Sequence, residues 1–177
     1  DQRNGKVQIV ASSSFFVPKP FTPFQWFGQD TIETLEKKQK LLKSSVTSRK
    51  LTVNYHGAET SFLEAVFARG DRKLNAVLLE AHRRGLRFDG WADCFGFDAW
   101  MQIFADLGID PAFYANRQRS FDEVLPWDHL DYGIKKSFLI EECKRAYAAQ
   151  TTPNCREKCS NCGAACFKGG LCVEKRC

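Results

Sequence analysis

The pattern of apolar and polar residues predicts two β-strands in the first third of the chain. Residues 6–11 are almost continuously apolar, which is typical of a strand buried on both faces of a sheet. Residues 51–55 alternate between apolar and polar side chains, which indicates a second strand. Two strands bury too little surface to make a stable sheet, so we expect the remaining strands in a missing N-terminal part.

Helical periodicity covers most of the remaining chain up to residue 149. The predicted helices begin near Asp30, Ser61, Asp71, Asp98, Asp110 and Lys135. Residues 12–27 contain prolines at positions 18, 20 and 23, so we predict an extended, stiff loop there. The predicted fold class is therefore α/β, with strands and their connections in residues 1–60, a helical region in 61–150 and a cysteine-rich tail in 151–177.

Composition and charge narrow the class of protein. The chain has 177 residues, 44% of them hydrophobic, and its net charge of +5 does not by itself indicate nucleic-acid binding. No run of about 18 apolar residues is present, so we expect no membrane span. Cys94 and Cys143 each stand alone in apolar surroundings, as reduced thiols do, which favours a cytoplasmic location. Because the chain begins at Asp1 and its only methionine is Met101, we expect it to be part of a longer protein.

The tail carries the densest chemical signal of the sequence. Six of the eight cysteines lie there, at positions 155, 159, 162, 166, 172 and 177. Such short spacings gather sulfur atoms around a metal more easily than into mutual disulfides, although a disulfide knot stays an alternative. The predicted ligands are Cys155, Cys159, Cys162 and Cys166, and Cys172 or Cys177 can replace any of them. They would hold zinc or an iron–sulfur cluster.

Five short motifs are spread along the chain. They are SFFVPKPFTPFQW at residues 14–26, RGDRK at 69–73, GIDP at 108–111, LPWDH at 125–129 and TPNC at 152–155. These motifs resemble the C-terminal part of a family of radical S-adenosylmethionine (SAM) proteins of the cobalamin-binding type, which has methylthiotransferase-like relatives. In that resemblance, residues 14–26 correspond to a late barrel strand and the loop that follows it. The resemblance covers nearly the whole chain.

The resemblance implies the C-terminal portion of a radical SAM partial barrel, with a helical cover and a small metal-binding tail. SAM, and cobalamin in this type of protein, would belong to the missing N-terminal part, and the methylthiotransferase likeness suggests an RNA or protein substrate. Lys19, Thr22 and Gln25 follow a predicted barrel strand, at the rim where barrels place ligand contacts, so we expect their loop beside SAM or substrate. No cluster motif of the radical type stands near the start of the chain, so this chain alone should not cleave SAM.

The alternative function is a nonenzymatic zinc-knuckle module that binds RNA or a ribosomal partner. Basic side chains surround the tail cysteines, as in zinc knuckles that hold nucleic acid: Lys158, Lys168, Lys175 and Arg176. The three histidines are His56, His82 and His129. Each is explained more simply as a solvated or packed residue than as a ligand or proton-transfer group.

Overall fold

The computed structural model describes residues 7–164, which form two compact units. The first unit comprises residues 7–17 and 29–117, and the second comprises residues 18–28 and 118–164. Together they make a mixed α/β protein, which agrees with the fold class that the sequence predicts. The predicted segment boundaries near residues 60 and 150 do not coincide with the boundaries of the two units.

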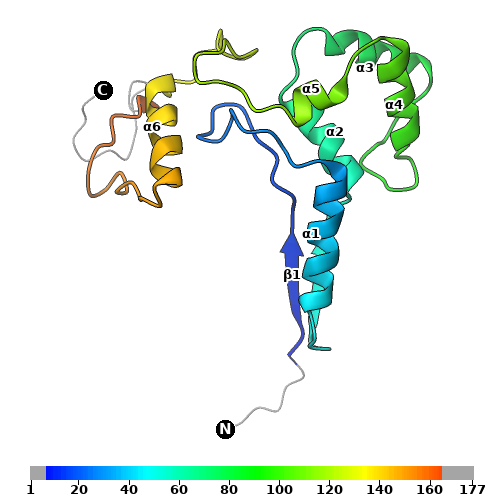
Figure 1. The fold of residues 1–177 in the computed structure, drawn as a ribbon, viewed down its shortest axis with the longest axis horizontal. Coiled ribbons are helices and arrows are strands. Elements are labelled where there is room, and N and C mark those ends of the chain that lie inside the picture. The colour runs from blue at the N-terminus through cyan, green and yellow to red at the C-terminus, as the bar shows by residue number, and fades with distance from the viewer. Residues whose placement is uncertain (1–6, 165–177) are drawn as a thin grey trace. The chain divides into compact units, whose positions relative to one another are not determined.

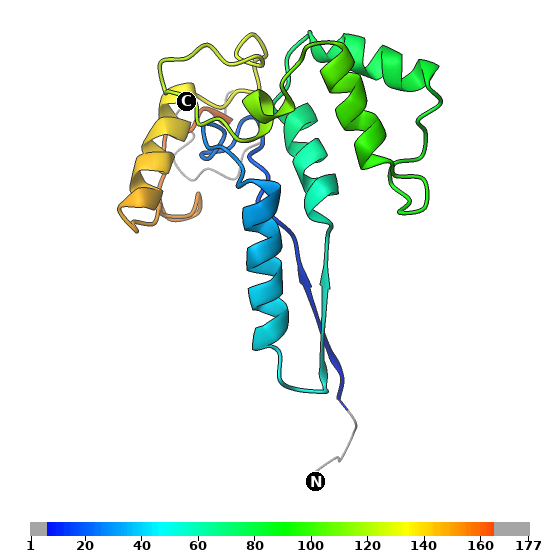
Figure 2. The same ribbon diagram turned by 45° about the vertical axis from the view of Figure 1, so that its right-hand side comes forward.

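A strand–helix–strand segment forms a small parallel sheet in the first unit. Strand β1 (Ile9–Ser13) pairs in parallel with β2 (Leu51–Tyr55), with Ile9 opposite Leu51. Helix α1 (Ile32–Ser45) connects the two strands and lies beside them in both Figure 1 and Figure 2. The bounds of β2 agree with the prediction, whereas β1 begins and ends later than the predicted strand.

Contacts between α1 and the end of β2 hold the helix along the sheet. The Gln39 side-chain amide donates a 3.3 Å hydrogen bond to the His56 carbonyl, just past β2. The ammonium group of Lys43 lies 4.3 Å from the centre of the Tyr55 ring, a cation–π contact. Leu35 is the buried residue of α1, and the lysines of this helix face solvent.

Strand β1 is exposed along its whole length. Ile9 and Val10 keep 56% and 61% of their surface exposed, although apolar side chains of a parallel strand are ordinarily covered on both faces. The expected burial of this strand on both faces is therefore not met within residues 7–164. The described sheet has one partner strand, and neither face of β1 is covered.

Four helices build the core of the first unit. They are α2 (Ala58–Ala68), α3 (Leu74–Arg83), α4 (Phe97–Asp106) and α5 (Pro111–Ala115). Their buried apolar faces meet in one cluster, which includes Phe62, Val66, Val77, Ile103 and Phe104. This spacing of buried positions is the helical periodicity on which the prediction of these elements rested.

A fully buried arginine ties α2 to α5. The Arg69 guanidinium donates hydrogen bonds of 2.5 and 2.6 Å to the carbonyls of Tyr114 and Ala115, and one of 2.6 Å to the carbonyl of Arg117. These carbonyls lie at and just beyond the C-terminal end of α5, where a helix leaves its acceptors without partners and favours a positive charge. Arg69 therefore acts as a buried cap for α5.

The second unit is built around the loop of residues 18–28 and one helix, α6 (Lys136–Tyr147). Its core consists of Trp26, Leu125, Trp127 and Leu139. The ring of Phe121 meets Trp26 edge-on, with 4.9 Å between their centres. No helix in residues 7–164 is long and apolar enough to cross a membrane.

Several predicted helix starts need correction. Helix α3 begins at Leu74 rather than at Asp71, and the residue that caps α1 is Thr31 rather than Asp30. Helix α2 begins at Ala58 rather than at Ser61, because the Ser61 hydroxyl does not cap the helix and instead accepts a 3.0 Å hydrogen bond from the Gln29 amide. Helix α4 begins at Phe97, ahead of the predicted cap Asp98, which lies inside the first turn. By contrast, Asp110 caps α5 as predicted, with its carboxylate accepting from the Ala112 N–H at 2.9 Å.

Candidate functional site

Residues 20–26 fold back on themselves through turns. The Thr22 hydroxyl donates a 2.8 Å hydrogen bond to the Lys19 carbonyl, and the Gln25 N–H donates to the Thr22 carbonyl at 3.1 Å. The Phe21 N–H donates to Gln25 Oε1 at 3.0 Å. The prediction of an extended, stiff loop is wrong for this part, because its polar side chains and backbone close turns between the prolines.

Gln25 is the buried centre of this loop. It is 2% exposed, and its Oε1 accepts a second hydrogen bond, of 2.6 Å, from Trp127 Nε1. The two N–H donors also fix which end of the amide is the oxygen, since the amide nitrogen cannot accept. Of the three predicted ligand-contacting residues, Lys19 is exposed, Thr22 is half-buried and serves a local turn, and Gln25 alone is buried.

A pocket of about 340 Å³ lies beside Gln25, between the loop, the segment before α6 and the first turn of α6. Its lining residues are Phe21, Gln25, Trp127, Asp128, His129, Leu130, Asp131, Ile134, Lys136 and Leu139. Apolar and polar side chains contribute in similar measure. The pocket belongs wholly to the second unit, so its geometry follows from the packing of that unit.

One wall of the pocket is made by a strained residue. Phe21 has a φ of +57°, a left-handed conformation that a bulky side chain rarely adopts. The Phe21 ring stacks on Tyr132, with 4.3 Å between ring centres and 26° between ring planes. Such strain persists only where the surrounding contacts determine the conformation, and the Gln25 side chain supplies one of them.

The charges around the pocket are partly paired. Asp128 Oδ2 accepts a 2.7 Å hydrogen bond from the Lys136 ammonium and a 3.0 Å bond from the Leu125 N–H. Asp131 Oδ1 accepts a 2.7 Å bond from the Gly133 N–H. Each carboxylate thus uses one oxygen within the protein and leaves the other oxygen without a hydrogen bond from the described residues.

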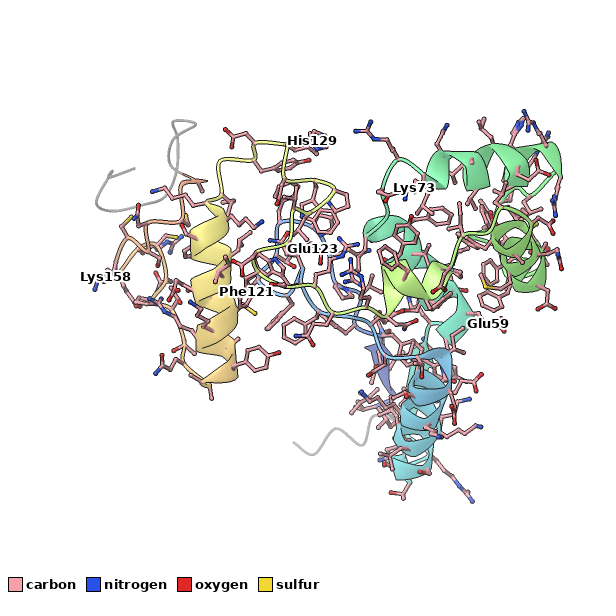
Figure 3. The ribbon with its side chains drawn as sticks, turned by 45° about the horizontal axis from the view of Figure 1, so that its top comes forward. Glu59, Lys73, Phe121, Glu123, His129 and Lys158 are labelled. Carbon is pink, nitrogen blue, oxygen red and sulfur yellow. The ribbon has the colours of Figure 1, made fainter. Side chains whose placement is uncertain are left out.

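The histidines are largely solvated, as the simpler interpretation predicts. His129 is exposed on the loop before α6, where Figure 3 shows it, and it lines the pocket. His56 is exposed just past β2. His82 is exposed on α3, and it borders an apolar hollow of about 440 Å³ in the first unit.

The cysteine turn, residues 159–164, is the second feature of this unit. The Asn161 N–H points at the Cys159 sulfur and the Ala164 N–H at the Cys162 sulfur, both at 3.4 Å. Hydrogen bonds from backbone N–H groups stabilise negative charge on sulfur, and metal-binding thiolates depend on such partners. The turn therefore fits the thiolate ligands that zinc or an iron–sulfur cluster requires.

The cysteine turn is held against the start of α6. The Lys135 N–H donates a 2.8 Å hydrogen bond to the Cys162 carbonyl, and the Lys135 ammonium donates to Asn161 Oδ1 at 2.7 Å. Gly163 is buried with a φ of +98°, and a Cβ atom there would come 2.3 Å from the Gly133 carbonyl oxygen. Only glycine fits this close approach of two backbones.

Of the other predicted ligands, the structure describes Cys155, which is not gathered with this turn. Cys155 is exposed in a separate turn, whose Glu157 and Lys158 N–H groups donate to the Asn154 carbonyl. Within residues 7–164, no three histidine, cysteine or acidic side chains come together as a metal site. Cys166, Cys172 and Cys177 lie outside the described residues. Figure 3 shows Lys158 on the opposite side of α6 from Phe121.

The two isolated cysteines differ from each other. Cys143 is fully buried on α6, and burial raises the pKa of its thiol, so it stays protonated and is no candidate ligand. Cys94 is exposed in a turn before α4, which corrects the expectation of apolar surroundings.

Sequence reasoning missed the residues that position the site. The indole N–H of Trp127, in the LPWDH motif, orients Gln25. Lys135 is predicted only as the start of a helix, and no local signal marks it as the residue that holds the cysteine turn. Gly163 permits that turn through its positive φ.

These features define a class: a mixed α/β protein with a parallel strand–helix–strand segment and a cysteine turn held beside a mixed polar and apolar pocket. Comparisons with protein-family models, with curated proteins and with solved structures gave no match for this chain. The function therefore has to be argued from the residues and their geometry.

Proposed function

We propose that this chain is the C-terminal segment of a radical SAM enzyme, which supplies late barrel strands, a helical cover and an auxiliary metal site. The proposal rests on the motif resemblance and on one structural observation. β1 and β2 form a parallel pair whose apolar side chains on β1 are uncovered. The substrate stays open, with RNA or protein as the suggested class.

The exposure of the parallel pair β1 and β2 supports the proposal that neighbouring strands cover it. Parallel sheets occur almost only with both faces covered, and a pair of strands is marginal by itself. Val7 is 63% exposed, as are Ile9 at 56% and Val10 at 61%, so apolar side chains on both faces of the strand are left in water. Adding strands beside this pair would bury these side chains and satisfy the open backbone edges.

The order of elements also suits an α/β barrel. β1, α1, β2 and α2 alternate along the chain, which is the repeating unit of such folds. The loop of residues 18–28 and His56 follow the carboxyl ends of β1 and β2 in the sequence. Barrels and open α/β sheets place their ligand contacts in such segments.

The tail would contribute a metal centre separate from SAM activation. Cys159 and Cys162 would hold the metal through the cysteine turn, with Cys155 and Cys166 as the remaining ligands. An iron–sulfur cluster would supply a one-electron site, whereas zinc with four thiolates would serve structure alone. The backbone N–H groups of Asn161 and Ala164 would stabilise the thiolate charge in either case.

The first experiment is anaerobic purification of the chain, followed by measurement of iron, sulfide and zinc per molecule and a visible absorption spectrum. Iron with matching sulfide supports the auxiliary cluster. One zinc without colour makes the tail a structural staple or a docking knuckle, and intact protein without metal overturns the ligand assignment. Cys159→Ser and Cys162→Ser should each lose metal, whereas Cys94→Ser, at an exposed cysteine of the first unit, should retain it.

A second experiment tests the sheet. Val10→Lys replaces an exposed side chain, so it should leave the unfolding temperature of this chain nearly unchanged. In a longer protein whose added strands cover β1, the same lysine would be buried without a partner and should prevent stable folding. Equal tolerance of Val10→Lys in both contexts would contradict strand completion. Thr52→Lys on β2, also exposed, serves to compare the two strands.

A further inference from the structure

We propose that the pocket beside Gln25 binds an uncharged planar heteroaromatic ring of the nucleobase class, presented as a nucleoside. The inference uses only residues of the second unit, so it holds whether or not the chain belongs to a radical SAM enzyme. Its basis is the pattern of used and unused hydrogen-bonding groups around the pocket, together with the aromatic wall.

The floor of the pocket offers a donor that the protein does not use. Both hydrogen bonds of the Gln25 side chain go to its Oε1, from the Phe21 N–H and from Trp127 Nε1. Its Nε2 donates no hydrogen bond within residues 7–164, yet it is not among the buried polar atoms that lack both a partner and solvent. A side chain that is 2% exposed thus keeps its amide N–H groups accessible where it borders the pocket.

The rim offers acceptors in the complementary position. Asp128 and Asp131 each have a second carboxylate oxygen without a hydrogen bond from the described residues. A ligand that fits must therefore carry an acceptor for the amide of Gln25 and donors for the rim. Nucleobases and the ribose hydroxyls of nucleosides combine both kinds of group on one small molecule.

The aromatic wall favours a flat ring over an aliphatic ligand. The Phe21 ring lines the pocket, and its stack on Tyr132 holds it in place from outside. Aromatic side chains bind bases by stacking, in a way that tolerates different bases. The volume of about 340 Å³ is at the lower end for ligand pockets, which suits one ring system with a small substituent.

The charge of the lining argues against a phosphorylated ligand. Two aspartates face one lysine, and the lysine is already paired with Asp128 at 2.7 Å. The lysine and the two aspartates of the lining give it a net charge of −1. We therefore expect a nucleoside to bind more tightly than its 5′-monophosphate, whose charge would be repelled.

The test is titration of the chain with adenosine, followed by NMR of the Gln25 side-chain amide and the Trp127 indole N–H, with calorimetry for the affinity. We expect saturable shifts of both signals at millimolar adenosine and weaker binding of adenosine 5′-monophosphate. Indole tests whether any aromatic ring suffices. Absence of shifts, equal binding of indole, or tighter binding of the monophosphate would each overturn the proposal.

Two variants separate the binding groups from the fold. Gln25→Glu at pH 8 keeps the acceptor for Phe21 and Trp127 but removes the donor, and it should weaken adenosine binding about fivefold or more. Tyr132→Ala removes the outer ring of the stack at a 61% exposed position, so the fold should survive while binding weakens by about fivefold.

The matched control is Tyr147→Ala. Tyr147 is 68% exposed and also stacks on a loop phenylalanine, Phe27, at 5.4 Å between ring centres, but it does not line the pocket. Its removal should leave adenosine affinity unchanged. Equal losses in Tyr132→Ala and Tyr147→Ala would show a general effect on the second unit and would overturn the assigned site.

Discussion

Replacing Gly163 by alanine should release the cysteine turn from the segment before α6. The new Cβ atom would lie 2.3 Å from the Gly133 carbonyl oxygen and 3.2 Å from Lys135 Cγ, both inside van der Waals contact. The backbone has a φ of +98°, and a left-handed conformation costs an alanine about 1–2 kcal/mol. Since the atom in the way is backbone, relief requires the whole turn to move.

The expected consequence is weaker metal binding. If the docked turn is the arrangement that holds the metal, a cost of about 1–2 kcal/mol lowers affinity by roughly five- to thirtyfold, and the displaced carbonyl adds to this. Competition of the chain with a chromophoric chelator for zinc, under reducing conditions, measures the change. The hydrogen bond from the Lys135 N–H to the Cys162 carbonyl should be lost together with the affinity, which amide hydrogen exchange at Lys135 reports.

Gly85→Ala provides the control. Gly85 has a φ of +82°, but its position has open space around a new Cβ atom and lies in the first unit. It therefore imposes a similar backbone cost without touching the tail, and metal affinity should not change. If Gly163→Ala binds zinc as tightly as the unaltered chain, docking against Gly133 is not part of the metal site and the reasoning fails.

Three further outcomes follow from single contacts. Arg69→Met removes the side-chain donor from the carbonyls of Tyr114, Ala115 and Arg117, of which Ala115 keeps the Gln29 N–H, and should lower the free energy of unfolding by about 2 kcal/mol or more, measured by urea unfolding; a loss below about 1 kcal/mol would contradict its role as a cap. Cys143 should resist iodoacetamide in the folded chain and react only after denaturation, because burial raises the pKa of its thiol. Mass spectrometry measures the labelling, and labelling of Cys143 as fast as at exposed cysteines would refute this. The pKa of Glu80 is lowered by the hydrogen bond from Arg84, and that of Asp106 by bonds from Gln102 and Arg84, so their stabilisation is present above the ordinary values of 4.5 and 3.8 and is lost as pH falls below them. Arg84→Gln should therefore flatten the fall of melting temperature with acid, and an unchanged profile would count against this network.

Local sequence signals predict a helix start correctly where the capping hydrogen bond joins residues close together in the sequence. Asp110 followed by Pro111 starts α5 because the carboxylate reaches an N–H two residues on and proline has no N–H to lose. Ser61 has the same kind of capping signal, yet its hydroxyl accepts from Gln29, 32 residues away. Tertiary contacts thus decide which of two similar signals marks a helix start.

The role of Gln25 shows the same limit at the site. Its place after a strand predicts a loop, which the structure has, but its partner Trp127 is 102 residues away in the sequence. Nothing in the local motif distinguishes Gln25 from Lys19 or Thr22, which face solvent or a local turn. The packing of the second unit makes that distinction, because it buries the Gln25 side chain beside a pocket.

The cysteine spacing predicts one ligand set, but the described members of that set lie in two different turns. The turn that contains Cys159 and Cys162 directs a backbone N–H at each sulfur and is fixed to Lys135. Cys155 lies in its own turn, which Asn154 closes through its carbonyl and its side chain. Metal binding that recruits Cys155 therefore requires residues 154–158 to rearrange, whereas the cysteine turn is already organised. Metal should consequently change the amide exchange of residues 154–158 more than that of residues 159–164, and equal changes in both would refute this division.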